Sequence, residues 1–378
     1  MQTQYLKVDP EQPETEIIAR AAELIGSREL VAFPTETVYG LGAGAYYPEA
    51  VNKIFIAKQR PAANPLLVHV SNQAQVKELV LEVPPAARLL MNKFWPGPLS
   101  LVLPARASVP SVVTGGKSSV GLRMPDHPVA LALIEAAGPI AAPSANLSGR
   151  PSPLTAGHVR DDLDGRIAAV LDAGSTGLGL ESTIIDFSQG RIQLIRRGAI
   201  ALETLEEISG ERIALPDREE NEFAHHQIKA EIVISENEES FWKKLYEISQ
   251  TDRRLGVVLS IGRNCGAVST HRCNEAEDYN PSPVWLKGTR PIKEAGDIFL
   301  PRYNNAGAST AGPNIISTNY KVQASYKLDL NSGSSNLYGI LRDAEQQQLD
   351  ILLFAPLALD GSGIAASLWD RIKQAAKK

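Results

Sequence analysis

The sequence contains little cysteine, no long apolar run and no internal repeat. Its 378 residues include only Cys265 and Cys273, which argues against a disulfide framework, and neither cysteine has partners at the spacing of a zinc site. No apolar stretch reaches the roughly 18 residues that a membrane-spanning helix requires. The N-terminus has no basic-then-apolar signal. We therefore expect a cytoplasmic protein that has no membrane partner.

The chain also lacks an excess of positive charge. Its formal net charge of −5 gives no support for nucleic-acid binding over the whole surface, although an acidic protein can still carry a local basic cleft. With 43% hydrophobic and 21% charged residues, the composition is that of a globular protein. A chain of 378 residues is long enough for two domains.

The most informative stretch is residues 33–70, which runs from F-P-T-E-T-V-Y-G-L-G to K-Q-R-P-A-A-N-P-L-L-V-H-V. Apolar residues 30–33 predict a buried strand, and residues 48–58 have helical spacing. At the end of that helix, Lys58 and Arg60 can both turn toward one anion, such as a polyphosphate or a carboxylate. The alternative interpretation is a solvated pair of surface charges.

A second polar group follows a short apolar strand in I-A-A-P-S-A-N-L-S-G at residues 140–149. Ser144, Asn146 and Ser148 follow a proline here, which is a common way to present ligand-binding groups on a loop. The alternative is an ordinary polar turn with local capping hydrogen bonds.

Together these segments resemble the YrdC-type threonylcarbamoyl-AMP synthase family, in its long two-domain form. The shared pattern covers about residues 15–205 and includes W-P-G-P-L-S at 95–100, G-L-R-M-P at 121–125, P-S-A-N-L-S-G at 143–149 and E-S-T-I-I-D at 181–186. The second domain of the longer members is similar to S-S-N-L-Y-G-I-L-R-D at 334–343 and G-I-A-A-S-L-W-D-R-I-K-Q-A-A at 363–376.

The resemblance implies an α/β fold: a YrdC-like twisted mixed sheet with helices and a ligand cleft, followed by a smaller Rossmann-like parallel α/β C-terminal domain. The predicted domains are residues 1–212 and 230–378, joined by a linker and possible lid at 213–229. Residues 274–330 are rich in Asn, Gly, Pro and Ser and match no pattern that we can assign.

Hydrophobic periodicity in the first domain predicts helices at 16–25, 48–58, 72–80, 85–94, 127–137 and 201–208. Strands are predicted there at 29–33, 66–70, 99–103, 119–123, 139–142, 168–171, 183–187 and 191–196. In the second domain we expect strands at 231–235, 255–260 and 350–355, and helices at 238–249, 334–348 and 363–376.

The resemblance also implies a reaction. Threonine, bicarbonate and ATP form threonylcarbamoyl-adenylate and pyrophosphate, the first step of threonylcarbamoyladenosine modification of tRNA, which separate downstream transfer enzymes complete. The attacking carbamate is already an anion, so we expect catalysis by positioning and electrostatics. Mg²⁺ is expected to arrive with ATP, and no metal site on the protein is predicted.

Family positions assign roles to individual residues of this sequence. The expected catalytic residues are Lys58, Arg60, Ser144 and Asn146. Those expected to bind threonine are Thr35, Thr37, His69, Arg123, Ala142 and Ser182. Those expected to bind ATP are Lys58, Arg60, Asn64, Ser118, Ser144, Asn146, Ser152, Arg196 and His226.

Several of these residues have an alternative structural role. His69 lies in an apolar strand and could be a core histidine, and Ser182 could simply be a strand residue. Arg123 is flanked by apolar residues, so it requires a ligand or a carboxylate partner, because an unpaired buried charge is costly. In the linker only a histidine of the family's lid motif remains, which puts closure over ATP in doubt. A fragment ending near Leu215 is expected to bury its own core and bind threonine.

Two other functions remain open. Hydrogenase-maturation carbamoyltransferases contain a YrdC-like portion, but their acylphosphatase and zinc-finger segments are absent from this sequence. A noncatalytic module that binds double-stranded RNA or tRNA through a basic concave face is the alternative from another class.

Overall fold

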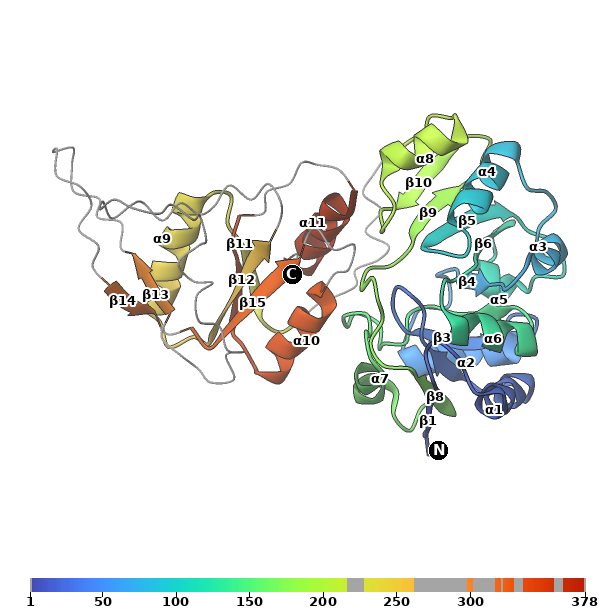
Figure 1. Cartoon of the computed structure of the whole chain (residues 1–378), viewed down its shortest axis with the longest axis horizontal. Helices are drawn as coiled ribbons and strands as arrows, with labels where there is room; N and C mark the ends of the chain where they lie inside the picture. Colours follow the sequence, from blue (N-terminus) through green and yellow to red (C-terminus); the bar gives the residue numbers. More distant parts are fainter. Residues whose placement is uncertain are drawn as a thin grey trace. The chain divides into compact units, whose positions relative to one another are not determined.

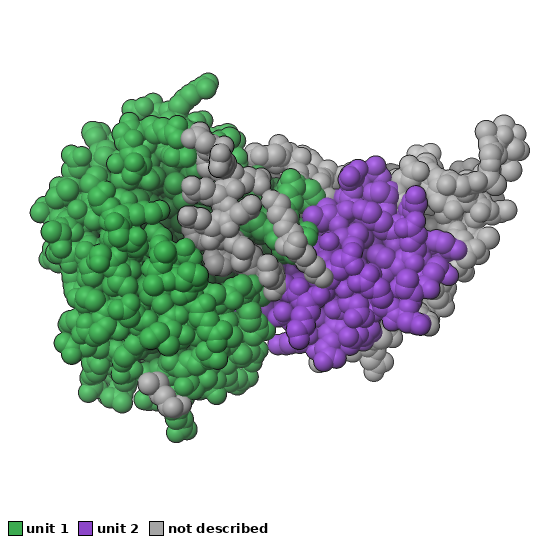
Figure 2. Space-filling view, turned by 180° about the vertical axis from the view of Figure 1, so that it is seen from behind, with its two compact units in different colours: residues 1–227, 332–339, 359–378 green, residues 228–331, 340–358 purple. Residues whose placement is uncertain are grey.

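The computed structural model describes residues 2–215, 228–261, 298–301, 317–320, 322–329, 336–356 and 363–376 (Figure 1). The chain divides into two compact units, which Figure 2 shows in separate colours. Unit 1 comprises residues 1–227, 332–339 and 359–378, and unit 2 comprises residues 228–331 and 340–358. The domain boundaries inferred from the sequence stay a prediction.

Unit 1 contains one ten-stranded sheet in the order β1-β8-β2-β3-β7-β4-β6-β5-β9-β10. Its strands are β1 (Gln4–Lys7), β2 (Val31–Phe33), β3 (Gly40–Gly44), β4 (Leu67–His69), β5 (Leu99–Pro104), β6 (Ser119–Arg123), β7 (Ile140–Ala141), β8 (Ala169–Asp172), β9 (Thr183–Asp186) and β10 (Gln193–Arg196). The sheet contains both parallel pairs, such as β4 with β6, and antiparallel pairs, such as β5 with β6. The predicted mixed sheet is therefore confirmed.

Helices cover both faces of this sheet. They are α1 (Thr15–Gly26), α2 (Pro48–Lys58), α3 (Gln73–Leu79), α4 (Pro85–Phe94), α5 (Ser111–Thr114), α6 (Pro128–Ala137), α7 (Ala156–Leu163) and α8 (Leu202–Ser209). Unit 1 also contains α11 (Gly363–Ala376). Side chains alternate along β8: Ala169 and Leu171 join the core under α1 and α6, whereas Val170 joins the core that includes α2, α4 and α7. Figure 1 shows α1 and α6 side by side. Among the described helices, none has the length and apolar content needed to cross a bilayer.

Unit 2 is built on a separate four-stranded parallel sheet, as predicted. Its strands are β11 (Glu231–Ile234), β16 (Ile351–Phe354), β12 (Leu255–Ile261) and β15 (Ala324–Asp329), in that order. The other elements are α9 (Glu238–Ser249), the two-stranded pair β13 (Ile298–Pro301) and β14 (Ser317–Tyr320), and α10 (Leu337–Gln346), which begins in unit 1 and continues in unit 2. A capping box between Asn237 and Ser240 starts α9. Phe241 and Leu245 of that helix pack against Val257 and Leu353.

The helices and strands predicted by periodicity are present, but β1, β3, α5 and α7 were not predicted. The glycine-rich sequence of β3 conceals a strand, because glycine is a poor strand former. Close packing explains its glycines. A β-carbon on Gly42 would lie 2.8 Å from Ile140 Cγ2, and one on Gly44 would lie 2.6 Å from Tyr47 Cδ2. Strands β13, β14 and β15 fall within residues 274–330, where the sequence matched no pattern, and most of that segment lies outside the described residues.

Gly198 provides a test of how tightly unit 1 is packed. A β-carbon there would lie 2.3 Å from the Thr183 backbone nitrogen and 2.5 Å from the Glu181 carbonyl oxygen. Because backbone atoms cannot rotate away, we expect Gly198→Ala to lower the free energy of unfolding by about 1–3 kcal/mol, measured by urea denaturation. Gly26→Ala is the control, since a β-carbon there meets nothing within 4 Å. It should be neutral or stabilising by up to about 1 kcal/mol. Equal midpoints for the two variants would contradict the tight packing at Gly198.

Candidate active site

Three polar side chains lie in one row across the sheet of unit 1. His69 ends β4, Arg123 ends β6, and the two residues are register partners in a parallel pair. Ser100 of β5 is the antiparallel partner of Arg123. Register partners on neighbouring strands point to the same face of a sheet, so these side chains lie close together. Two of them, His69 and Arg123, are predicted threonine-side residues.

Arg123 is 4% exposed and has three partners. Its Nη2 donates to Thr37 Oγ1 at 2.8 Å and lies 2.7 Å from Glu36 Oε2, while its Nε donates to the Gly97 carbonyl at 3.4 Å. The hydroxyl oxygens of Thr35 and Thr37 are 2.8 Å apart. Glu36 is therefore the carboxylate partner that a buried arginine requires. Sequence reasoning did not select Glu36, although it stands between the two threonines.

Glu36 has a further property that suits a ligand site. Within the described residues, its Oε1 is buried and accepts no hydrogen bond. A buried carboxylate oxygen that accepts no hydrogen bond costs free energy. A ligand group that donates a hydrogen bond to this oxygen would therefore be favoured.

Ser182 joins the threonine side of the predicted site to the ATP side. Its Oγ lies 2.8 Å from Ser100 Oγ and accepts a hydrogen bond from Arg196 Nη2 at 3.1 Å. The Ser182 carbonyl oxygen accepts from Arg196 Nε at 3.1 Å and Nη2 at 3.0 Å. Burial lowers the pKa of Arg196 to about 10, and the charge of Glu181 opposes this shift. The predicted contacts of Ser182 and Arg196 thus belong to one network.

Lys58 lies at the C-terminal end of α2 and is 2% exposed. Its ammonium group donates to the carbonyl oxygens of Ser144 and Asn146. The cation is therefore fixed to the loop that carries two other predicted catalytic residues. The structure brings Lys58, Ser144 and Asn146 together through the carbonyl oxygens of the last two. The sequence segments that contain them do not reveal this contact when each is considered alone.

The side chain of Arg60 contacts a different part of the structure from that of Lys58. Gln59 ends the helix in the left-handed conformation, with φ 53°. Arg60 Nη2 makes a long 3.5 Å contact with the Pro65 carbonyl oxygen, and among the described residues Arg60 Nε is buried without a hydrogen-bond partner. Burial lowers the pKa of the Arg60 guanidinium. The two cations have different protein partners, and the unsatisfied donor is the one on Arg60.

His69 is enclosed by aromatic and charged neighbours. Its ring meets that of Phe33 edge-on, with centroids 5.8 Å apart. Burial, together with the positive charge of Arg123, lowers the pKa of His69 to about 3, so the ring is neutral at pH 7. In the described part of the chain its Nδ1 has no hydrogen-bond partner. A neutral imidazole of this kind can bind a ligand group but does not add positive charge.

Two more predicted residues lie on the loops that follow β7. The Ser152 hydroxyl is buried and donates to Glu181 Oε1 at 2.7 Å. The Ala142 backbone N–H donates to the carbonyl oxygen of Leu67, the first residue of β4, at 2.9 Å. The contact of threonine with the backbone near Ala142, which the resemblance implies, stays a prediction.

Asn64 and Ser118 are less closely connected to the rest of the site. Asn64 is half-buried and Ser118 is exposed. Their loops run close together, because a β-carbon on Gly115 would lie 2.6 Å from the Ala63 carbonyl oxygen. His226 lies outside the described residues, so its predicted contact with ATP stays a prediction.

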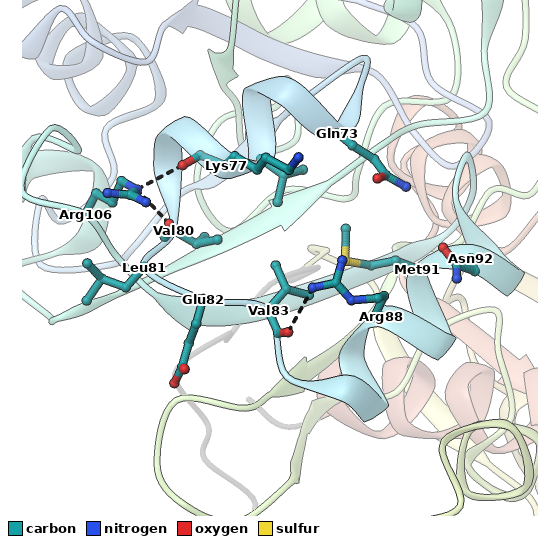
Figure 3. Close-up of a pocket in the computed structure, with 11 residues that line it drawn as sticks. Gln73, Lys77, Val80, Leu81, Glu82, Val83, Arg88, Met91, Asn92 and Arg106 are labelled. Atoms are coloured by element: carbon teal, nitrogen blue, oxygen red, sulfur yellow. Dashed lines mark hydrogen bonds between the residues drawn. The ribbon is translucent and has the colours of Figure 1, made fainter.

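A separate hollow of about 200 Å³ lies between α3 and α4 (Figure 3). None of the predicted site residues lines it. Arg106 Nε donates to the carbonyl oxygens of Lys77 at 2.9 Å and Val80 at 2.8 Å, and Arg88 Nη2 contacts the Val83 carbonyl at 3.5 Å. Their guanidinium groups contact backbone oxygens rather than project into open space. The residues for which coordinates are described contain no group of three or more His, Cys, Asp or Glu that could hold a metal ion.

The sheet of unit 1 is twisted and mixed, and it carries buried cations and hydroxyl groups at its strand ends. These features are typical of an α/β protein that binds anions. Comparison with known proteins identifies the family. A family model described as telomere recombination, covering Sua5, YciO and YrdC, matches residues 23–198. The threonylcarbamoyl-AMP synthase of Bacillus subtilis is 46% identical over 253 residues, which cover 64% of this chain and 73% of that protein. The enzyme of the same name from Pyrococcus abyssi is 52% identical over 192 residues, which cover 50% of this chain and 56% of that protein.

One solved structure is similar over nearly the whole chain. The crystal structure of P. abyssi Sua5 complexed with L-threonine aligns with a TM-score of 0.77 and 31% identity, and the match covers 99% of this chain and 98% of that one. The chain belongs to the Sua5/YciO/YrdC family, among its long, Sua5-like threonylcarbamoyl-AMP synthases.

The depressed pKa of His69 predicts a pH-dependent stability. Between about pH 6.5 and about pH 3 the unfolded chain binds a proton at this ring that the folded chain does not, so stability is lost as the pH falls. The loss is up to about 1.4 kcal/mol per pH unit for this group. We expect His69→Gln to flatten the dependence of the urea-unfolding free energy on pH across this range. His127, whose pKa is also lowered by burial, contributes equally to both proteins. Parallel pH profiles would show that His69 is not buried in neutral form.

Proposed function

We propose that this chain converts L-threonine, bicarbonate and ATP into threonylcarbamoyl-AMP and pyrophosphate, with the residues described above as its active site. The observation that carries the proposal is the contact of Ser182 with Arg196, because it joins the threonine-side and ATP-side residues in one buried network. Two anions must react here, and a desolvated site with fixed donors can hold both against their repulsion.

The threonine subsite is proposed to lie at the row formed by His69 and Arg123. Arg123 supplies a guanidinium for the amino-acid carboxylate, and Thr35 and Thr37 supply hydroxyl groups beside it. The free Nδ1 of the neutral His69 ring is available to a hydroxyl or amino group of the substrate. Buried polar atoms that lack partners support this assignment, since a matching ligand satisfies them.

The nucleotide subsite is proposed to include Lys58, Arg60, Ser144, Asn146 and Arg196. In the reaction a carbamate oxygen forms a bond to the α-phosphorus of ATP, and the bond from that phosphorus to the bridging oxygen breaks. Pyrophosphate leaves with the electron pair. The buried cations stabilise the charge that develops on the phosphoryl oxygens, and the loop positions the nucleotide.

Mg²⁺ is proposed to enter as part of the substrate, bound to the phosphates of ATP. Asn64, Ser118, Ser152 and His226 are proposed as further nucleotide contacts from the surrounding loops. The cytoplasmic location and the transfer of the product to separate tRNA-modifying enzymes stay predictions.

The first test measures pyrophosphate. We expect the purified protein to release pyrophosphate from ATP only when threonine and bicarbonate are both supplied, because the attacking group is the carbamate that they form. A coupled pyrophosphate assay, with each component omitted in turn, checks this dependence. ATP turnover that is indifferent to threonine would contradict the proposed reaction, whereas RNA binding without pyrophosphate release would favour the noncatalytic alternative.

The second test removes the cations. Lys58→Ala and Arg60→Ala should each reduce the rate by well over tenfold, since one fixed donor in a desolvated site is typically worth about 3 kcal/mol, or roughly a hundredfold. Lys53→Ala is the matched control on the same helix, because its side chain is 42% exposed and pairs with Glu29. That variant should retain the wild-type rate within about twofold. Melting temperatures identify any variant that has unfolded. Near-normal rates for folded Lys58 and Arg60 variants would mean that the site is misplaced.

A further inference from the structure

Glu181 is a buried carboxylate to which the proposed mechanism assigns no role. It precedes Ser182 in E-S-T-I-I-D and is 8% exposed. Its Oε1 accepts the Ser152 hydroxyl at 2.7 Å. Its Oε2 accepts the Tyr338 hydroxyl at 2.5 Å and Arg371 Nε at 3.3 Å. The carboxylate therefore connects a predicted ATP-binding residue to two residues from the C-terminal part of the sequence.

Both C-terminal residues belong to unit 1. Tyr338 lies in the first turn of α10, 157 positions after Glu181, and Arg371 lies in α11, 190 positions after it. The same helix α11 also holds the segment next to Arg196: Ser367 Oγ donates to the Gly198 carbonyl at 2.7 Å, and Arg371 Nη2 donates to the Arg197 carbonyl at 3.3 Å.

The electrostatics of the cluster favour a fixed geometry. Burial raises the pKa of Tyr338 well above its ordinary value, so the phenol keeps its proton and donates it. Burial acts to lower the pKa of Arg371, but its interactions with Glu181 and Tyr338 together outweigh burial and raise the pKa overall. Buried charge pairs contribute little net stability compared with apolar packing of the same volume. In this cluster the hydrogen bonds instead fix the orientation of the Glu181, Tyr338 and Arg371 side chains.

We propose that Tyr338 and Arg371 are positioning residues that hold Glu181, and through it Ser152 and the Arg196 segment, in the geometry that binds ATP. The inference rests on the proposed function, since Ser152 and Arg196 are the nucleotide-side residues. If Arg371 has this role, helix α11 helps to position the residues of the proposed ATP site. A fragment ending near Leu215 lacks both positioning residues, so we expect it to bind ATP more weakly than the full-length chain, while its expected binding of threonine stays a prediction.

Changes in the Glu181 cluster should affect the binding of ATP and the binding of threonine to different extents. Ser152 and the Arg196 segment depend on the Glu181 cluster, whereas the Ser182 hydroxyl is also held by Ser100 at 2.8 Å, and Arg123 is held by Glu36 and Thr37. Disturbing Glu181 should therefore weaken ATP binding more than threonine binding.

The test uses Tyr338→Phe and Arg371→Met in the full-length chain. Tyr338→Phe removes one donor with almost no change of shape. The matched control is Tyr326→Phe in unit 2, where the hydroxyl of Tyr326 donates to Asp343 Oδ2 at 2.7 Å. All three variants lose a bond to a carboxylate, but only the first two touch the Glu181 cluster. Steady-state kinetics for each substrate, ATP binding by titration calorimetry and melting temperatures are measured for every protein.

We expect the KM for ATP and the dissociation constant for ATP to rise about five- to tenfold in Tyr338→Phe and Arg371→Met, which is less than for direct loss of a hydrogen bond to a charged ligand, because neither residue contacts ATP itself. The KM for threonine should change by less than about twofold. Arg371→Lys, which keeps the charge but offers fewer directed donors, should fall between wild type and Arg371→Met. Tyr326→Phe should leave all these constants unchanged even if its melting temperature falls.

Unchanged ATP constants in folded Tyr338→Phe and Arg371→Met would overturn the proposal, as would equal losses for ATP and threonine. If the wild-type protein releases no pyrophosphate with threonine, the proposed function fails separately. In that case the calorimetric comparison of ATP binding still decides whether the cluster positions the nucleotide site.

Discussion

The site depends above all on one buried charge, the guanidinium of Arg123. A cation enclosed by a sheet and its helices cannot remain unpaired, so the structure must provide a carboxylate within reach. Glu36 meets this requirement at 2.7 Å, and the loop that carries it brings Thr37 into contact with the same guanidinium. The charge of Arg123 also helps to keep the neighbouring His69 ring neutral. One ion pair thus fixes a contact between the 34–39 loop and β6, and the Arg123 charge adds to the effect of burial on the neighbouring His69 ring.

The same constraint explains why the nucleotide side is built differently. Lys58 donates to the backbone carbonyl oxygens of Ser144 and Asn146 and lies 3.4 Å from Asn146 Oδ1, and Arg196 binds the backbone and hydroxyl of Ser182. Neutral oxygens orient a cation without cancelling its charge, so the positive field remains available to phosphate groups. The carboxylate partner of Arg123 and the neutral oxygen contacts of Lys58 and Arg196 are consistent with the proposed separation of an amino-acid subsite from a polyanion subsite.

Much of this arrangement was predictable from the sequence, because the helices and most strands have strong hydrophobic periodicity and the motifs are specific. The failures have identifiable physical causes. Strand β3 is rich in glycine for reasons of close packing that only the neighbours Ile140 and Tyr47 reveal. Glu36 stands within a recognised motif, but its importance comes from the buried partner Arg123 on another strand. Lys58 and Arg60 are close in sequence, yet the left-handed residue between them gives them different neighbours. Contacts of this kind are properties of the fold and cannot be seen in local patterns.

Helix α11 has a consequence for how the protein is made. The N-terminal part of the chain emerges first from the ribosome. The ten strands of the large sheet can therefore form long before residues 363–376 emerge. During that interval the Glu181 carboxylate has neither Tyr338 nor Arg371 to bind. A chain that is cut short or stalled would therefore carry a nearly finished sheet whose nucleotide-side network is incomplete. In this arrangement the nucleotide-side network is completed only after α11 has been synthesised and has packed beside Glu181.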